Sequence, residues 1–167
     1  MALIILNTEI NASLELCFNL STSIDLHKES AIRTKEKVIA GRKSGLIKLN
    51  ESVTWKAKHF GLWHTLTVKI TKYKKPTMFT DEMIQGGFKY MKHKHEFNKV
   101  KNGTMMVDTF EFQSPMGMLG KIVDALVLKS YLTKFLNERN RVLKLYAETD
   151  KWKLVLEVNN NKNTNNT

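Results

Sequence analysis

One abrupt change of periodicity constrains the fold of this chain more than any other feature. Between residues 51 and 113, apolar and polar residues alternate in segments separated by turn signals, which is typical of strands with one buried and one solvated face. Ser114-Pro115 ends the alternation, and from Met118 the apolar spacing becomes helical. The sequence therefore predicts an antiparallel sheet followed by one long helix. The expected strands cover residues 51–60, 62–73, 78–85, 88–100 and 104–113.

The residues before this run predict a strand, two short helices and another strand. Residues 2–10 are rich in β-formers, and Asn11 can cap a helix over residues 13–19. Thr22 and Ser23 offer a second helix start, and that helix should end near residue 30, before a strand at residues 37–41. Two short helices after one strand differ from the single long crossover of a βαβ unit.

The predicted long helix runs from Met118 to about Glu148, and its apolar stripe needs a dry surface. About 30 residues make a rod of roughly 45 Å. The inner face of the sheet is the only candidate surface, so the helix should lie on it. Residues 151–158 look weakly β-like, and residues 159–167 are an asparagine-rich run with too few apolar residues to fold. We expect one domain over residues 1–149 and a polar tail over residues 150–167.

Bulk composition excludes some classes of protein. No apolar segment approaches the length of a membrane span, and the N-terminus has no basic leader. Cys17 is the single cysteine, so no intrachain disulfide can form, which fits a cytoplasmic location. The net charge is +11, but the lysines are dispersed and arginine is scarce. This pattern predicts weak binding to anionic surfaces rather than specific recognition of nucleic acid.

The segment Phe88–Phe97 carries the most informative polar pattern. At strand periodicity, His93 and His95 share a face with Met91 and Phe97, and the lysines between them share the other face. The lysine face must be solvated because a lone buried ammonium is very costly. The two imidazoles are therefore predicted to point inward.

Other polar residues alternate with apolar ones on the predicted inner face. Four of the five histidines and two aspartates belong to this set: His59, His64, His93, His95, Asp81 and Asp108. They could form a structural network, the polar end of a ligand pocket, or a site that binds metal or performs acid–base chemistry. The spacing His93-Lys-His95 can present two imidazoles to a metal, but it is a weak signal, and a helical His-Glu-x-x-His motif is absent. No metal site and no cofactor are predicted.

The order of elements resembles the helix-grip superfamily, often called SRPBCC. The resemblance also rests on His93-Lys-His95, the aspartate of Met106-Val-Asp108, and Ser114-Pro115-Met-Gly117 before the last helix. This superfamily includes START lipid-transfer domains, birch-pollen-allergen-like proteins and polyketide cyclases. The chain looks most like small bacterial SRPBCC proteins, some of which are loosely described as cell-division inhibitors, and the likeness covers residues 1–149.

The resemblance implies an α+β helix-grip fold. A curved seven-stranded antiparallel sheet would wrap around the long C-terminal helix, with two short helices between strands 1 and 2. A cavity between sheet and helix holds apolar or amphipathic small molecules in relatives, and some members catalyse cyclisation, hydrolysis or aromatisation there. The superfamily has no universal catalytic motif, so the resemblance transfers no catalytic residue.

Three functions follow as hypotheses. The first is a carrier or sensor of a hydrophobic small molecule. The second is a cyclase- or hydrolase-like enzyme with His93, His95 and Asp108 as acid–base residues. The third is a basic protein that docks on anionic membrane or nucleic acid. Nothing in the sequence indicates an oligomeric state. The residues predicted to bind the ligand are Trp55, His59, His64, Phe79, Asp81, Met83, Met91, His93, His95, Met106, Asp108, Phe110, Leu119, Val123 and Leu126.

Overall fold

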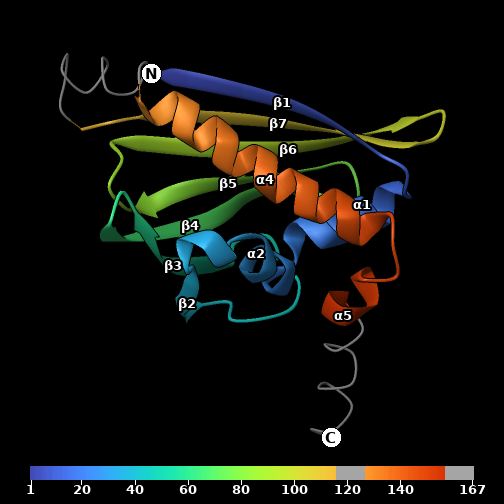
Figure 1. Ribbon diagram of the computed structural model, residues 1–167, viewed down its shortest axis with the longest axis horizontal. Helices are drawn as coiled ribbons and strands as arrows, with labels where there is room; N and C mark the ends of the chain where they lie inside the picture. The colour runs from blue at the N-terminus through green and yellow to red at the C-terminus, as the bar shows by residue number, and fades with distance from the viewer. Residues whose placement is uncertain (116–126, 157–167) are drawn as a thin grey trace, which may run out of the picture.

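The computed structural model describes residues 1–115 and 127–156, which form a curved sheet with helices on one side (Figure 1). The elements in chain order are β1 (Ala2–Ile10), α1 (Leu14–Thr22), α2 (Ile24–Ser30), the 3₁₀ turn η1 (Ile32–Thr34), β2 (Lys37–Gly41), β3 (Ser52–His59), β4 (Leu62–Lys74), β5 (Met78–Gln85), β6 (Tyr90–Val100), β7 (Gly103–Gln113), α4 (Lys129–Ala147) and α5 (Trp152–Leu156). The predicted α+β class and the two short helices after the first strand are confirmed.

The strands of the described residues form one seven-stranded sheet in the order β1-β7-β6-β5-β4-β3-β2. All neighbouring strands are antiparallel. The first strand of the chain pairs with the last, so that Ala2 lies opposite Phe112. Every other neighbouring pair of strands is consecutive in sequence, as in the predicted meander.

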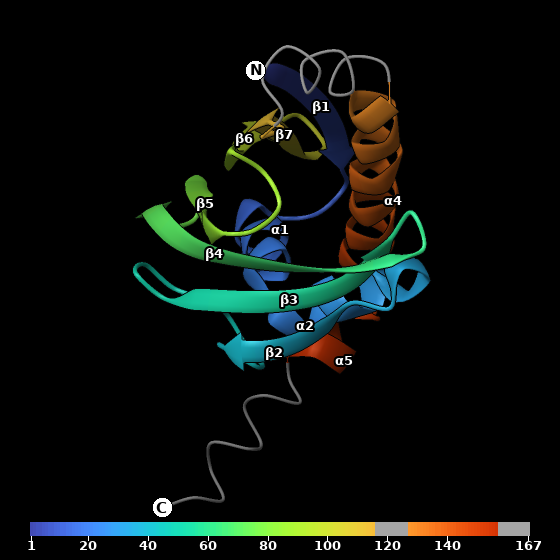
Figure 2. The same cartoon turned by 90° about the vertical axis from the view of Figure 1, so that its left-hand side faces the viewer.

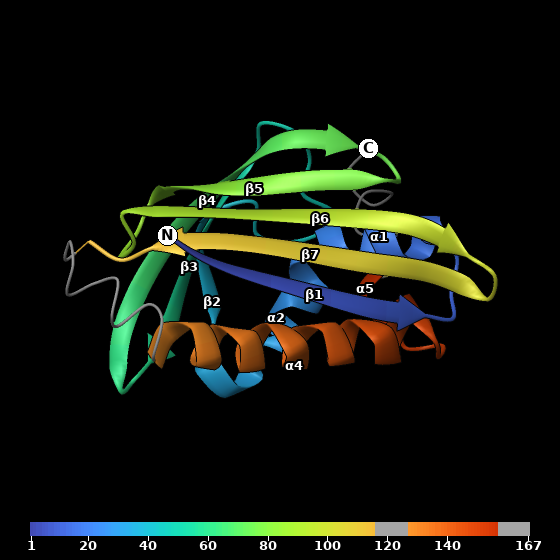
Figure 3. The ribbon, with the colours of Figure 1, turned by 90° about the horizontal axis from the view of Figure 1, so that it is seen from above.

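The sheet curves strongly around α4, which lies on its concave side (Figure 2). Seen from above, α4 runs alongside β1 and spans much of the length of the sheet (Figure 3). Register shifts between β4 and β5 help to bend the sheet, because a bulge kinks its strand and increases the local twist. Helices α1 and α2 also contact α4, and together the three helices cover the concave face.

Serines begin both short helices. The Ser13 hydroxyl accepts a hydrogen bond from the Leu16 N–H at 3.2 Å, and Ser23 caps α2 through the Leu26 N–H at the same distance. The start at Ser23 is confirmed. The prediction of Asn11 as the first cap is wrong, because Ser13 caps α1. The backbone N–H of Asn11 donates to Glu148 Oε1 at 2.8 Å and links the end of β1 to the end of α4.

Helix α1 fills one end of the concave face with solid core. Phe18 is fully buried, and its ring meets Tyr73, Phe79 and Phe97 edge-on at centroid distances of 5.2, 5.7 and 5.5 Å. The neighbouring Cys17 is a buried free thiol, and burial raises its pKa. The cavity therefore has to lie toward the other end of the sheet.

Two predictions near the C-terminus have different outcomes. The weak β signal at residues 151–158 is wrong over the described part, because residues 152–156 form the short helix α5. The helical turn places Trp152, Val155 and Leu156 at the spacing that packs them against the core beside α1. The long helix ends at Ala147, close to the predicted end near Glu148, but its predicted beginning at Met118 lies outside the described residues.

Trp63 of β4 is exposed, and the Lys56 ammonium lies 5.5 Å from its ring centroid. The neighbouring Leu62 is 66% exposed, because pairing with β5 starts only at Thr67 and the end of the β3–β4 hairpin projects beyond it. No helix within residues 1–115 and 127–156 combines the length and apolar character needed to cross a membrane.

Candidate functional site

A cavity of about 310 Å³ lies between the concave face of the sheet and α4. Its wall combines residues of β3 to β7 with residues of α2 and α4. Small-molecule sites typically begin near this volume. Most of the wall is apolar. Its polar groups form three sets: one on β5 to β7, called the floor below, one beside α2, and one where the cavity opens to solvent, called the mouth.

Nine of the residues predicted to bind a ligand lie on this wall. They are Trp55, His59, His64, Phe79, Asp81, Met91, His93, His95 and Phe110. The alternation along each strand brings them to one face. Their role in ligand binding stays a prediction.

Six other predicted residues do not appear on the described wall. Met106 is fully buried, with its sulfur 3.7 Å from the hydroxyl of Ser21 on α1. Met83 packs against the core near the β4–β5 bulges, where the register shift breaks the simple alternation. Asp108 is buried and contacts the wall residues His93 and His95. Leu119, Val123 and Leu126 lie outside the described residues.

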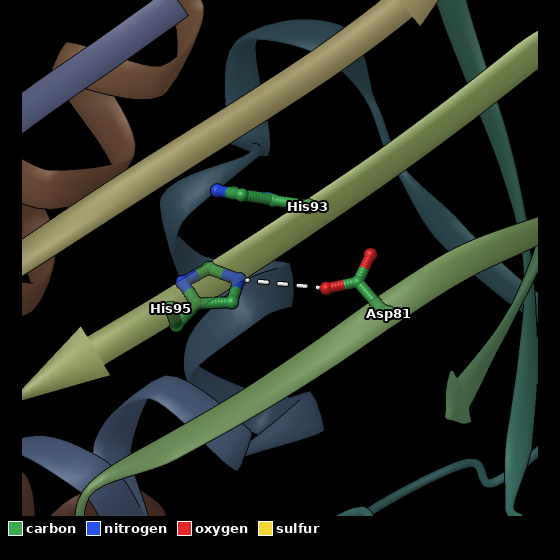
Figure 4. Close-up of side chains that lie close together, drawn as sticks. All are labelled: Asp81, His93 and His95. Carbon is green, nitrogen blue, oxygen red and sulfur yellow. Dashed lines mark ion pairs between the residues drawn. The ribbon is translucent and has the colours of Figure 1, made fainter. Parts of the chain in front are cut away.

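The floor of the cavity is built by β6 and its two neighbours. The register places His93 opposite Asp81 of β5, and His95 opposite Asp108 of β7. His95 Nε2 lies 3.4 Å from Asp81 Oδ1, and Figure 4 shows the two side chains turned toward each other. The two imidazole rings lie side by side with centroids 3.8 Å apart, and Phe79 stacks on His95 at 4.2 Å.

Asp108 contacts both histidines from the β7 side. Its Oδ1 accepts a hydrogen bond from His93 Nε2 at 3.1 Å. The same oxygen lies 2.6 Å from His95 Nδ1, in an ion pair that is not aligned as a hydrogen bond. Asp108 is only 1% exposed. A buried carboxylate without partners would be strongly destabilising, and the two histidines offset that cost.

The surroundings shift the pKa values of the two floor histidines in opposite directions. Burial alone would lower the pKa of His95, but the carboxylates of Asp108 and Asp81 outweigh it and raise that pKa to about 9. Burial and the charge of His95 lower the pKa of His93. Burial would raise the pKa of the Asp108 carboxyl, and the two histidines instead hold it well below its usual range.

Helix α4 reaches this floor through Asn140. The Asn140 side-chain amide donates to Asp108 Oδ2 at 2.6 Å and to Thr8 Oγ1 of β1 at 3.1 Å. One buried amide therefore ties the helix to two strands. The sequence analysis did not include Asn140, because a single polar residue in a helical stretch gives no sign of facing inward.

A second polar cluster, formed by His27, Glu36 and Arg139, lines the cavity beside α2. The Arg139 guanidinium donates to His27 Nδ1 at 2.8 Å, and His27 Nε2 donates to Glu36 Oε2 at 2.7 Å. The His27 ring stacks on Trp55 with centroids 3.8 Å apart. Burial and the Arg139 charge lower the pKa of His27. Burial would raise the pKa of Glu36, but contact with His27 and Arg139 lowers it.

This second cluster was missed from the sequence. His27 lies in a seven-residue helix, and Glu36 lies in a loop before β2, where no periodicity indicates a face. Arg139 is one of several charged residues on α4. The available signal was that His27 is the one histidine outside the predicted strands.

The mouth of the cavity is marked by exposed residues on its wall. Phe60, His64, Thr65 and Gly87 are exposed there, at the β3–β4 and β5–β6 turns. Tyr131 of α4 bridges toward this side, with its hydroxyl 2.6 Å from His59 Nδ1. Burial lowers the pKa of His59.

Comparison with known proteins identifies the fold through structure rather than sequence. No protein-family model matches the chain, and a comparison with curated proteins found no significantly similar sequence. Solved structures do match. Protein TTHA0849 of Thermus thermophilus superposes with a TM-score of 0.69 at 16% identity, covering 89% of this chain and 100% of that one. Ginseng major latex-like protein 151 from Panax ginseng gives 0.67 at 14% identity, covering 89% and 98%.

A third match, protein CV1439 of Chromobacterium violaceum, has a TM-score of 0.66 at 12% identity and covers 88% of this chain and 97% of that one. The chain has the helix-grip fold. At these identities the similarity extends to the fold alone. The match nevertheless spans nearly the full length of each relative.

Within the helix-grip fold, this chain's cavity has an apolar wall, a mouth with a tyrosine–histidine pair, and a charged floor. The floor includes a group with metal-ligand chemistry: Asp81, His93 and His95 each offer one ligand atom, and these atoms lie within 4.8 Å of one another.

Proposed function

We propose that this chain binds a hydrophobic or amphipathic small molecule in the helix-grip cavity, as a carrier or sensor. The observation that carries the proposal is the cavity of about 310 Å³ with an apolar wall and a polar floor. A dry apolar cavity of about 150 Å³ binds benzene, so this volume suits a guest roughly twice that size. The helix-grip resemblance favours the same function.

The floor favours a neutral polar group over a carboxylate on such a ligand. The floor and the cluster beside α2 together contain two cations, His95 and Arg139. Both already contact partners, and the carboxylates of Asp81, Asp108 and Glu36 outnumber them. A ligand carboxylate would add to this negative charge in a poorly solvated place. A hydroxyl could donate to Asp81 or accept from a histidine without that cost.

The test is binding of N-phenyl-1-naphthylamine, a neutral apolar fluorophore chosen because an anionic dye would respond to the +11 net charge. Saturable 1:1 binding is expected. Ala57→Leu should weaken it at least about tenfold, because Ala57 is a buried wall residue and the larger side chain fills part of the cavity. Lys58→Leu is the matched control, since Lys58 is the exposed next residue on β3.

Competition and native mass spectrometry complete the experiment. 1-Decanol should displace the fluorophore better than decanoate. Native mass spectrometry of the chain purified from its host should show one retained small molecule. Absence of saturable binding, or equal affinity of the Ala57→Leu and Lys58→Leu variants, would reject the cavity as a binding site.

Acid–base catalysis at the same floor is a second candidate, favoured by the contact of His93 with Asp108. A neutral imidazole oriented by a carboxylate can take a proton near neutral pH. His93→Gln should then abolish conversion of the retained molecule, as followed by mass spectrometry, and leave its binding intact. An unchanged conversion rate would remove this candidate.

A further inference from the structure

We propose that Asp81, His93 and His95 bind one divalent transition-metal ion, of the zinc class, at the floor of the cavity. Neighbouring strands supply the three ligands, two imidazoles from β6 and one carboxylate from β5. Imidazole and carboxylate are the ligand types that Zn²⁺ accepts in sites with three protein ligands.

The distances suit a metal ion better than a direct ion pair. His95 Nε2 and Asp81 Oδ1 are 3.4 Å apart, which is long for a charge-assisted hydrogen bond. Ligand atoms of a tetrahedral ion with bonds of about 2.0–2.1 Å are separated by roughly 3.3–3.4 Å. The full trio lies within 4.8 Å, so small side-chain rotations bring all three atoms onto one ion.

Asp108 supplies the supporting shell that such sites use. Ligating histidines are commonly held by a carboxylate on the ring nitrogen that does not bind the metal. Asp108 contacts His95 through Nδ1, while Nε2 of the same ring is turned toward Asp81. Asn140 fixes Asp108 in turn, and Phe79 stacks on the His95 ring, so the ligand geometry is organised before any ion arrives.

The local charge also matches a divalent cation. Among the described residues that line the cavity or contact the two histidines, the carboxylates are Asp81, Asp108 and Glu36, and the guanidinium is Arg139. With neutral imidazoles, this leaves two negative charges in a buried region. A divalent ion bound there would neutralise this negative charge.

The proposed site would keep one coordination position open toward the cavity. Three protein ligands leave a fourth position of a tetrahedral ion for water or for a ligand oxygen. The open side faces the cavity because all three residues lie on its wall. An ion there would bind the polar end of the guest directly or activate a water beside it.

The test is metal binding by the full, tag-free chain after treatment with EDTA and removal of the chelator. Isothermal titration with Zn²⁺ should give one site per chain with a dissociation constant in the micromolar range or below. Co²⁺ should produce the visible absorption of a four-coordinate ion. Asp81→Asn should weaken Zn²⁺ binding by more than about 100-fold, and circular dichroism should confirm that this variant is folded.

His64→Ala is the matched control, because His64 lines the same cavity at its exposed mouth. It should bind Zn²⁺ as the wild type does. Absence of stoichiometric binding, equal affinity in Asp81→Asn, or loss of binding in His64→Ala would each overturn the proposal. Metal binding is measured without a small-molecule ligand, and fluorophore binding is measured in EDTA. A negative result in one experiment therefore leaves the other proposal standing.

Discussion

At the scale of single residues, the buried polar groups are stabilised by partners that come from distant parts of the chain. Asp108 of β7 depends on β6 and on Asn140 of α4, and His27 of α2 depends on Glu36 and on Arg139 of α4. Such groups are costly to bury alone and tolerable when their hydrogen bonds are complete.

His27 should make the stability of the chain fall in mild acid. The pKa of His27 is lowered in the folded state from its ordinary value of 6.5. Near and below pH 6.5, His27 is therefore protonated to a greater extent in the unfolded chain than in the folded chain. Stability therefore drops as pH falls through this window. His27→Gln should reduce the slope of unfolding free energy against pH by up to about 1.4 kcal/mol per pH unit. Urea denaturation in EDTA between about pH 5 and 7 measures this slope. An unchanged slope in His27→Gln would contradict the lowered pKa of His27.

The sequence could predict the inward residues of strands but not those of helices. His93 and His95 were predicted inward because side chains alternate along a strand, so the solvated lysines beside them fix their direction. Asp81 was predicted inward from its place between Phe79 and Met83. Asn140 and Arg139 have no such marker. Which polar residue of an amphipathic helix meets the floor depends on how the helix is rotated, and tertiary packing decides that.

At the scale of elements, strands and turns were predictable because their signals are local. The expected strands at residues 88–100 and 104–113 form the β6–β7 hairpin, and the residues between them, Lys101-Asn102-Gly103, carry the local turn signal. The bulges between β4 and β5 were not predictable, since they depend on the curvature of the whole sheet, and Met83 was misplaced as a result. The tail helix α5 was not predicted, because its few apolar residues fit the spacing of a strand as well as that of a helix.

Gly103 should be intolerant of any side chain. Its φ is +147°, and an added Cβ would collide with the carbonyl oxygen of Ile10, which ends the neighbouring strand β1. Gly103→Ala should lower the free energy of unfolding by about 2–3 kcal/mol.

Gly61→Ala separates strain from collision. Gly61 has φ +80°, but its Cβ would meet no atom within 4 Å. This variant should cost only about 1 kcal/mol, the penalty for a left-handed alanine. Equal losses in the two variants, measured by urea denaturation, would show that contact with β1 is not the cause.

At the scale of the whole molecule, the charge of +11 is spread over a surface on which lysines alternate with other residues along the strands. This distribution generates a diffuse positive field rather than a localised binding site.

The chain should therefore bind anionic vesicles weakly and reversibly. Cosedimentation with vesicles containing phosphatidylserine should be detectable at low salt and lost at about 300 mM NaCl, where charges are screened beyond a few ångströms. Vesicles of neutral phosphatidylcholine are the control. Binding that persists at high salt would indicate a specific apolar contact instead.

The pairing of β1 with β7 has a consequence for the order of events during synthesis. Ala2 pairs with Phe112, so β1, the first of the seven strands to be synthesised, has no neighbouring strand until nearly the whole sheet has been made. At about 5–20 residues per second the wait is roughly 5–20 s. Throughout that interval the nascent chain exposes an unpaired apolar strand, and the floor histidines can be reached by ions and small molecules before the last helix covers them.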